Sequence, residues 1–158
     1  MSQVYLFDWG DTLMVDFTQF SGKMCEWEKV EAVQGAKSTL SKLSQKSKIY
    51  IATGASESTV DEIKSAFNQV ELDEYITGYF CKANLGVEKG SSVFFKTILE
   101  HLELHPNDVT MVGDSLSRDI EPALKLGLNV VWFCENEQNS TNTNIRVISK
   151  LSELCELE

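Results

Sequence analysis

Three aspartates occupy positions from which a carboxylate could do chemistry. Asp8 comes directly after the short apolar run Val4–Phe7. Asp114 follows a second apolar run, Val109–Val112, and Asp119 comes five positions later. A carboxylate held at the end of a buried strand can act as a nucleophile, and carboxylate oxygens are also ligands that Mg²⁺ prefers. The alternative is that these aspartates only cap turns and helices.

A Thr-Gly pair stands in an equivalent place after a third apolar run. Thr53 and Gly54 directly follow Lys48–Ala52. A hydroxyl and the neighbouring backbone N–H groups can together hold a phosphate oxygen. Because this pair is also a common turn at the end of a strand, it indicates an anion site only in combination with other motifs.

Short apolar runs alternate with helical patterns along most of the chain. The runs expected to form strands are Val4–Phe7, Lys48–Ala52, Tyr79–Phe80, Val109–Val112 and Asn129–Phe133. Apolar residues at helical spacing predict helices over Ala36–Leu43, Ser58–Phe67, Ser91–Leu104 and Ser117–Leu126. This alternation predicts an α/β fold, a three-layer, doubly wound, Rossmann-like parallel sheet. Since ligands bind beyond the carboxyl ends of such strands, Asp8, Thr53 and Asp114 are expected to converge on one crevice.

The polar segments resemble the motifs of the haloacid dehalogenase (HAD) superfamily. Residues 7–13 (FDWGDTL) are similar to its first motif, D-x-D-G-T-L, and Thr12-Leu13 fixes the register so that Asp8 takes the nucleophile position. Residues 51–54 (IATG) resemble the second motif. Residues 111–120 (MVGDSLSRDI) resemble the fourth motif, G-D-x-x-x-x-D. The resemblance covers most of the chain, from about Val4 to Phe133.

The resemblance implies a Mg²⁺-dependent phosphohydrolase that works through an aspartyl-phosphate on Asp8. The implied metal ligands are Asp8, the backbone carbonyl of Gly10, and Asp114. Asp119 is expected close behind them, bound to Mg²⁺ directly or through water, or paired with Lys89.

The resemblance also implies a site for the phosphoryl group. Thr53 and Gly54 would bind its oxygens, and one lysine would offset the charge of the phosphate and the nucleophile. Residues 86–90 (GVEKG) resemble the family's G-x-x-K-P, so Lys89 is the expected lysine. Lys82 is the competing choice.

The first motif departs from the family pattern at one position. The second Asp of that motif serves phosphatases as general acid and base, whereas this chain has Gly10, followed by Asp11. Neighbouring side chains on an extended chain point in opposite directions, so Asp11 is expected to cap the next turn rather than replace the missing acid. Two alternatives therefore stay open: a catalytically weak or inactive binding or regulatory domain, and a non-phosphatase HAD hydrolase that cleaves carbon–halogen or carbon–phosphorus bonds. A response-regulator receiver is disfavoured, because its phosphorylated Asp follows a middle strand.

The spacing of the motifs leaves no room for a sizeable cap domain. Residues 14–34 contain Phe17, Phe20 and Trp27 and are expected to form a short flap or helix. We expect one domain over residues 1–156, with 157–158 a cloning remnant. In the family, capless members tend to act on macromolecules or to close the site with a neighbouring subunit. The expected partners are thus a phosphorylated small molecule or macromolecule, and a homo-oligomer that closes the site.

Composition narrows the class of protein further. The net charge of -10 disfavours nucleic acid as a partner, since an acidic surface repels phosphate backbones. A cation and a local lysine are then needed to attract a phosphorylated substrate. The N-terminus has no signal-peptide pattern and the apolar runs are too short to span a bilayer, so a cytoplasmic location without membrane contact is expected. The four cysteines lack C-x-x-C spacing and favour free thiols over zinc or disulfides.

The remaining conspicuous residues receive structural interpretations. Trp9 and Trp132 are expected in the core or at the edge of the site. His101 and His105 lie near the end of a predicted helix and are not expected to be catalytic. The polar residues 135–144 predict a surface loop.

Overall fold

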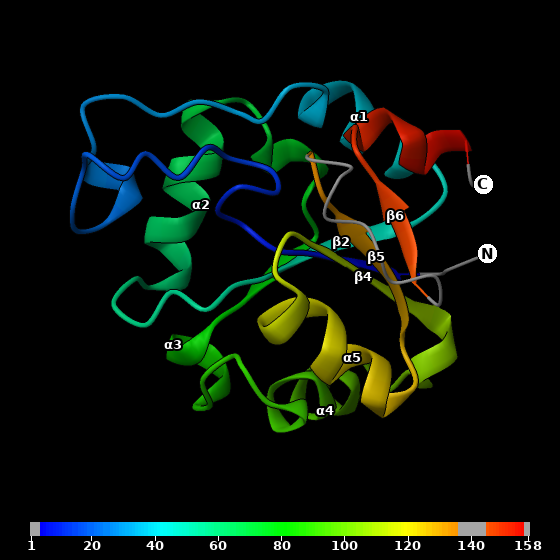
Figure 1. Cartoon of the computed structure of the whole chain (residues 1–158). Helices are drawn as coiled ribbons and strands as arrows, with labels where there is room; N and C mark the ends of the chain where they lie inside the picture. Colours follow the sequence, from blue (N-terminus) through cyan, green and yellow to red (C-terminus); the bar gives the residue numbers. More distant parts are fainter. Residues whose placement is uncertain (1–3, 136–144, 157–158) are drawn as a thin grey trace.

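The computed structural model describes residues 4–135 and 145–156, which form a parallel sheet flanked by helices (Figure 1). The strands lie in the order β3-β2-β1-β4-β5-β6, and all neighbouring pairs are parallel. They are β1 (Val4–Phe7), β2 (Lys48–Ala52), β3 (Gly78–Phe80), β4 (Val109–Gly113), β5 (Asn129–Phe133) and β6 (Arg146–Ile148). The strand order reverses at β1 and β4, which is where doubly wound sheets bind ligands.

The helices cover both faces of this sheet (Figure 1). They are α1 (Ala36–Leu43), α2 (Val60–Gln69), α3 (Lys82–Leu85), α4 (Ser92–Leu102) and α5 (Glu121–Leu126). Helices α1 and α2 pack on one face together with a 3-10 segment at Leu151–Glu156, whereas α4 and α5 pack on the other. The three-layer, doubly wound α/β fold predicted from the sequence is confirmed.

The side chains of β1 alternate between the two faces of the sheet, which explains why helices cover both faces. Tyr5 and Phe7 belong to the core under α1 and α2, whereas Val4 and Leu6 belong to the core under α4. Because side chains alternate across a strand, a run that is apolar at every position must be buried on both sides. All four residues of β1 are 4% exposed or less, so this strand is anchored in both cores.

The strand register brings the carboxyl ends of three strands to one level. Phe7, the last residue of β1, pairs with Ile51 of β2 on one side and with Val112 of β4 on the other. The backbone N–H of Asp8 continues the ladder by donating to the carbonyl of Val112 at 3.0 Å. The polar residues that follow these strands therefore start from neighbouring points on one edge.

Several helices begin or end differently from the prediction. Helix α2 begins at Val60 rather than Ser58, because Thr59 and Glu62 form a capping box that fixes its first turn. The predicted helix over residues 117–126 is instead a π-helical turn, Leu116–Ile120, followed by the shorter α5. The short elements α3 and β6 were not predicted. The predicted loop at 135–144 lies, apart from Glu135, outside the described residues, as do residues 157–158.

Candidate active site

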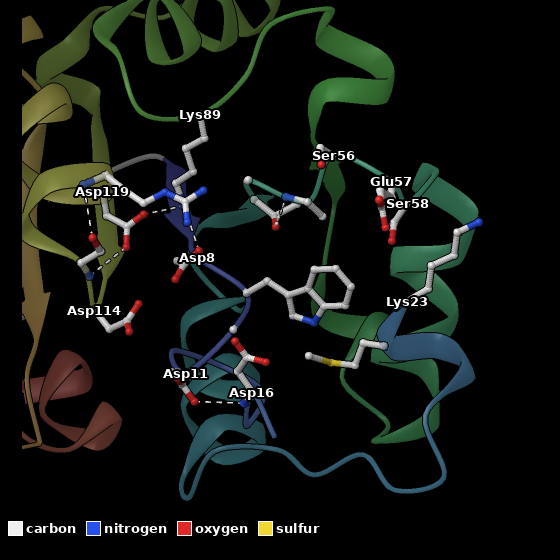
Figure 2. Close-up of a pocket in the computed structure, with 18 of the residues that line it drawn as sticks. Asp8, Asp11, Asp16, Lys23, Ser56, Glu57, Ser58, Lys89, Asp114 and Asp119 are labelled. Atoms are coloured by element: carbon white, nitrogen blue, oxygen red, sulfur yellow. Dashed lines mark hydrogen bonds and ion pairs between the residues drawn. The ribbon is translucent and has the colours of Figure 1, made fainter. Parts of the chain in front are cut away.

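The polar residues that follow β1, β2 and β4 line one cavity of about 450 Å³ at the carboxyl edge of the sheet (Figure 2). The sequence-predicted site residues that line this cavity are Asp8, Gly10, Thr53, Gly54, Lys89, Asp114 and Asp119. We call Asp8, Thr53, Lys89, Asp114 and Asp119 the floor of the cavity. The structure brings together every residue that the motifs placed in the site.

Lys89 lies at the centre of the floor with its ammonium group fully engaged. Its Nζ donates to Oδ1 of Asp8 at 2.8 Å and to the backbone carbonyl of Ala52 at 2.8 Å. It also pairs with Oδ1 of Asp119 at 2.5 Å, and its side chain is only 1% exposed. Lys82, the competing choice from the sequence, instead pairs with a glutamate at the surface. Of the two lysines, the structure thus places Lys89 against the expected nucleophile.

These ion pairs set the charge states of Asp8 and Lys89. Burial alone would raise the pKa of Asp8. The positive charge of Lys89, and then the hydrogen bonds of Asp8 with Asp114, Lys89 and the Trp9 backbone, hold that pKa below its usual value. Burial also disfavours the ammonium form of Lys89, but Asp8 and Asp119 outweigh this effect and raise the pKa of the lysine. Asp8 is therefore ionised, as a carboxylate nucleophile must be, and a cation lies beside it.

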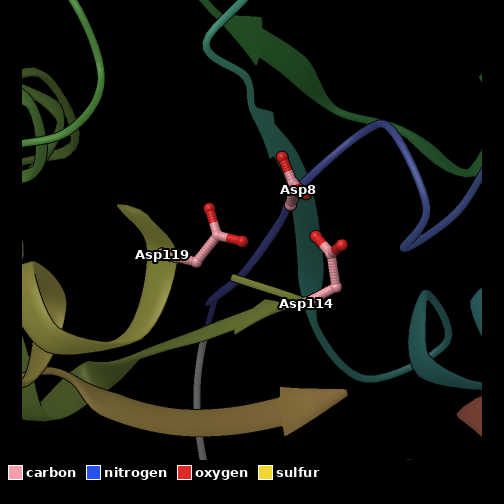
Figure 3. A group of neighbouring side chains, drawn as sticks. All are labelled: Asp8, Asp114 and Asp119. Carbon is pink, nitrogen blue, oxygen red and sulfur yellow. The ribbon is translucent and has the colours of Figure 1, made fainter. Parts of the chain in front are cut away.

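Asp8, Asp114 and Asp119 form a cluster of carboxylates (Figure 3). Each offers one oxygen, and these oxygens all lie within 4.8 Å of one another. The Thr12 hydroxyl is 3.2 Å from Oδ2 of Asp8 and 3.4 Å from Oδ1 of Asp114, so its single proton can serve either carboxylate. Burial, followed by the interactions with Asp8 and the charge of Asp119, raises the pKa of Asp114 to about 8.

This cluster fits a hard divalent cation. Three carboxylates face the single ammonium group of Lys89, so the ionised cluster carries an excess of two negative charges. Burial, and then the neighbouring carboxylates, raise the pKa of Asp114. Carboxylate oxygens, with an open cavity beside them for water, are the surroundings that suit Mg²⁺. Gly10 also lines the cavity, and the motif resemblance implies that its backbone carbonyl is a further metal ligand.

A glycine and a π-helical turn together position Asp119. A Cβ atom at Gly113 would overlap the Asp119 carboxylate, so the last residue of β4 leaves the space that this carboxylate fills. The turn Leu116–Ile120 points Asp119 inward, where it is 1% exposed and accepts a hydrogen bond from the backbone N–H of Ser115 at 3.1 Å. The packing around Asp119 thus requires glycine at position 113.

Thr53 and Gly54 form the part of the cavity that could hold an anion. The buried Thr53 hydroxyl accepts a hydrogen bond from the backbone N–H of Ala55 at 3.1 Å, which holds the turn after β2. A Cβ atom at Gly54 would overlap the guanidinium group of Arg118, which therefore lies directly over this turn and close to Lys89. Sequence reasoning missed Arg118; the signal available was a basic residue inside the fourth motif, directly before Asp119.

Residues 14–34, which we call the rim, lie over one side of the cavity. They contain one 3-10 turn, Met24–Glu26, and the ring centroid of Phe20 is 5.9 Å from that of Phe17 and 5.6 Å from that of Trp27. Trp27 and Met24 line the cavity. Lys23 ties the rim to α2 through an ion pair with Glu62 at 2.7 Å. The described rim is a short flap rather than a domain.

Two acidic residues stand beside Gly10. Asp11 has a left-handed backbone (φ of 60°), and its Oδ1 accepts a hydrogen bond from the backbone N–H of Asp16 at 3.0 Å, so it holds the following turn as expected. Asp16 lines the cavity and was not singled out in the sequence. Burial, and then the charges of Asp11 and Asp8, raise the pKa of Asp16.

The structure also places the remaining residues considered in the sequence. Trp9 is buried, lines the cavity and stacks on Phe67. Trp132 is buried, and its Nε1 donates to the backbone carbonyl of Asp114 at 3.0 Å, which supports the loop after β4. No disulfide joins the four cysteines, all of which lie within the described residues. Within residues 4–135 and 145–156, none of the helices has the length and apolar character needed to cross a membrane.

A family model described as haloacid dehalogenase-like hydrolase matches residues 7–133. This match covers the cavity floor, the rim and most of the sheet. The chain belongs to the haloacid dehalogenase-like hydrolases, which confirms the family expected from the motifs.

Curated relatives match shorter segments. Glyceraldehyde 3-phosphate phosphatase of Pyrococcus furiosus is 34% identical over 65 residues, which is 41% of this chain and 27% of that protein. Phospholysine phosphohistidine inorganic pyrophosphate phosphatase of Danio rerio is 48% identical over 42 residues, which is 27% of this chain and 16% of that protein. The matched segments thus span about a quarter or less of these relatives.

Solved structures share the fold across nearly the whole chain. An uncharacterized protein from Listeria monocytogenes serotype 4b has a TM-score of 0.84 at 19% identity, with 98% of this chain and 96% of that chain covered. The putative HAD-hydrolase YfnB from Bacillus subtilis, bound to magnesium, has a TM-score of 0.78 at 16% identity, with 99% and 98% covered. Both similarities establish the fold.

Proposed function

We propose that this protein is a Mg²⁺-dependent phosphohydrolase that forms an aspartyl-phosphate on Asp8. The observation that carries this proposal is the arrangement around Lys89, which pairs with Asp8 and Asp119 beside a three-carboxylate cluster. A nucleophile, a cation for an anionic substrate and a candidate metal site thus share one cavity. The two curated relatives are both named as phosphatases, which supports phosphoryl transfer over other HAD chemistry.

The residues of the floor have distinct roles in the proposed reaction. A carboxylate oxygen of Asp8 attacks phosphorus in line with the leaving oxygen. Lys89, the Thr53 hydroxyl and backbone N–H groups near Gly54 stabilise the charge on the phosphoryl oxygens as they pass through the transition state. Water then cleaves the bond between phosphorus and Asp8 and releases inorganic phosphate.

Mg²⁺ is the cofactor that the cluster fits. Asp8, Asp114, Asp119 and the carbonyl of Gly10 would hold it, and when bound it supplies positive charge to the transferring phosphoryl group. The magnesium bound to the similar Bacillus subtilis structure supports this choice of ion. The substrate is proposed to be a phosphorylated small molecule or macromolecule in the cytoplasm, with a neighbouring subunit closing the site over the rim.

Purified protein assayed with p-nitrophenyl phosphate and acetyl phosphate tests the proposal. Phosphate release is expected with Mg²⁺, and it should stop when EDTA removes the metal or when Asp8 is replaced in Asp8→Asn. The variant keeps nearly the same shape but cannot form the acyl phosphate. Turnover by Asp8→Asn equal to that of the wild type would contradict the proposal.

A non-catalytic binding domain is the second candidate. The absence of a side chain at Gly10 favours it, because that position carries the general acid and base in phosphatases that the chain resembles. This alternative predicts Mg²⁺-dependent binding of inorganic phosphate, measured by calorimetry, with no release of phosphate from either test substrate. Turnover that depends on Asp8 excludes it.

A further inference from the structure

Hydrolysis of a phosphate ester needs a proton for the leaving oxygen and a base for the attacking water. The carboxylates of the floor are committed elsewhere, since Asp8 is the proposed nucleophile and Asp119 is paired with Lys89. Asp114 belongs to the candidate metal cluster. The other titratable residues that line the cavity are Asp11, Asp16, Lys23, Glu57 and Arg118.

Asp16 occupies the space beside Gly10. A Cβ atom at Gly10 would lie 3.5 Å from Cβ of Asp16, 3.8 Å from its Cγ and 3.7 Å from its Oδ2. Apart from the chain neighbours of Gly10, the three atoms nearest to such a Cβ atom all belong to the Asp16 side chain. Asp8, Trp9 and Gly10 all line the cavity, and the ring of Trp9 stacks on Phe67. Asp16 thus presents a carboxyl group from the rim beside Gly10, which has no side chain of its own.

Backbone contacts connect the turn that carries Asp16 to the segment that follows β1 and begins with Asp8. Gly10 forms a parallel β-bridge with Met14, and the backbone N–H of Asp11 donates to the carbonyl of Met14 at 2.6 Å. The Asp11 carboxylate holds the backbone N–H of Asp16 at 3.0 Å. These contacts fix Asp16 relative to the nucleophile. They also engage one carboxylate oxygen of Asp11, which therefore serves to hold the turn.

The other acidic residue of the cavity lies on the opposite wall. Figure 2 shows Asp11 and Asp16 together on one side and Glu57 on the other, next to Ser56 and Ser58. Glu57 is exposed and precedes α2, away from the chain that follows β1. It therefore offers a carboxylate of the same chemistry in a different place.

We propose that Asp16 is the general acid and base of this enzyme, acting from the rim in place of a side chain at Gly10. The inference rests on the proposed phosphohydrolase function. In the first step a bond forms between an Asp8 oxygen and phosphorus, the bond to the leaving oxygen breaks, and the Asp16 carboxyl gives that oxygen its proton. In the second step water bonds to phosphorus, the bond to Asp8 breaks, and the Asp16 carboxylate takes a proton from the water. Asp8 and protonated Asp16 are regenerated.

Two aryl phosphates of similar shape test this role. Phenyl phosphate has a poorer leaving group than p-nitrophenyl phosphate and needs the proton more. Asp16→Asn is expected to lower kcat/KM for phenyl phosphate by about 10²-fold or more and that for p-nitrophenyl phosphate by less than about tenfold. Because water activation is also lost, p-nitrophenol should appear in a burst of one equivalent per enzyme, followed by a slow steady state. A purely structural role would produce neither the leaving-group dependence nor the burst.

A relocated carboxylate provides a rescue, and Glu57→Gln provides a matched control. Gly10 does not have a positive φ, and a Cβ atom there would meet Asp16 at ordinary contact distances, so shortening Asp16 to Ala opens further space beside it. The double variant Gly10→Asp/Asp16→Ala is expected to recover most of the kcat/KM for phenyl phosphate that Asp16→Ala loses. Glu57→Gln removes one carboxylate from the opposite wall and should keep the wild-type ratio between the two substrates.

Several outcomes would overturn the role of Asp16. Equal losses with both substrates and no burst would show that Asp16 only supports the fold of the rim, while Mg²⁺-dependent turnover of p-nitrophenyl phosphate would leave the phosphohydrolase function intact. Wild-type protein that hydrolyses p-nitrophenyl phosphate but not phenyl phosphate would also contradict a general acid. Absence of turnover with every substrate would overturn the proposed function and the role of Asp16 together.

Discussion

The floor and the rim of the cavity are held in place by different means. Asp8, Thr53 and Asp114 of the floor follow strands buried in both cores. Lys89, whose side chain is 1% exposed, locks the floor by pairing with Asp8 and Asp119. The rim has a single 3-10 turn, half-buried aromatic residues and an ion pair to α2, and the buried side chains of Met14, Met24 and Val33 anchor it in the core. The floor is thus placed by regular strands and buried ion pairs, whereas the rim, which carries Asp16, is a loop anchored at a few buried side chains.

Removal of Lys89 is expected to have the largest effect. Lys89→Ala leaves the Asp8 and Asp119 carboxylates without their cation, and breaking a buried ion pair in this way typically costs about 3–5 kcal/mol. Urea denaturation in EDTA should show this loss in the free energy of unfolding, together with loss of phosphate release.

Lys82→Ala is the matched control for this variant. It breaks the exposed ion pair with Glu88, and such pairs contribute about 1 kcal/mol or less. Comparable destabilisation by Lys82→Ala and Lys89→Ala would contradict the view that the floor is locked by its lysine.

Addition of one methyl group at the end of β4 is expected to have the next largest effect. In Gly113→Ala the new Cβ would overlap the Asp119 carboxylate, and forcing extra volume into a packed site costs about 1–3 kcal/mol. The displaced Asp119 should also weaken Mg²⁺ binding, which calorimetry can measure. Gly10→Ala faces only ordinary contacts with Asp16, so a loss of unfolding free energy as large as that of Gly113→Ala would show that the overlap is not the cause.

A rim substitution is expected to have the smallest effect on stability. Phe20→Ala removes the ring between Phe17 and Trp27, and because this residue is only half buried the loss should be about 1 kcal/mol or less. Acetyl phosphate is too small to need the rim, so its kcat/KM should stay near the wild-type value while that of p-nitrophenyl phosphate falls. A collapse of both values would show that the rim also supports the floor.

The same difference between floor and rim decides how much the sequence could predict. Asp8, Thr53 and Asp114 follow buried strands, and an apolar run is a local pattern that fixes both the strand and the residue at its end. Lys89 could be predicted only from the resemblance to the family motif. It lies far from Asp8 in the sequence, and only the folded chain brings the two residues together.

Asp16 and Arg118 could not be predicted in this way. Asp16 lies in a loop without periodicity, and its place depends on the β-bridge of Gly10 with Met14. Arg118 lies on a π-helical turn, whereas the residue pattern indicated an ordinary helix starting at Ser117. Strand β6 has only three residues, of which Arg146 is exposed, so it is too short for alternation to be recognised.

Chemical trapping of the intermediate tests the central claim most directly. Protein mixed with acetyl phosphate and Mg²⁺ should carry an acyl phosphate on Asp8, and borohydride reduces such a group to an alcohol, which converts the aspartate to homoserine. Peptide mass spectrometry is expected to find homoserine at position 8 in the wild type and none when EDTA is present or in Asp8→Asn. Steady Mg²⁺-dependent turnover without modification at position 8, or with homoserine at another aspartate, would contradict the assignment of Asp8 as the nucleophile.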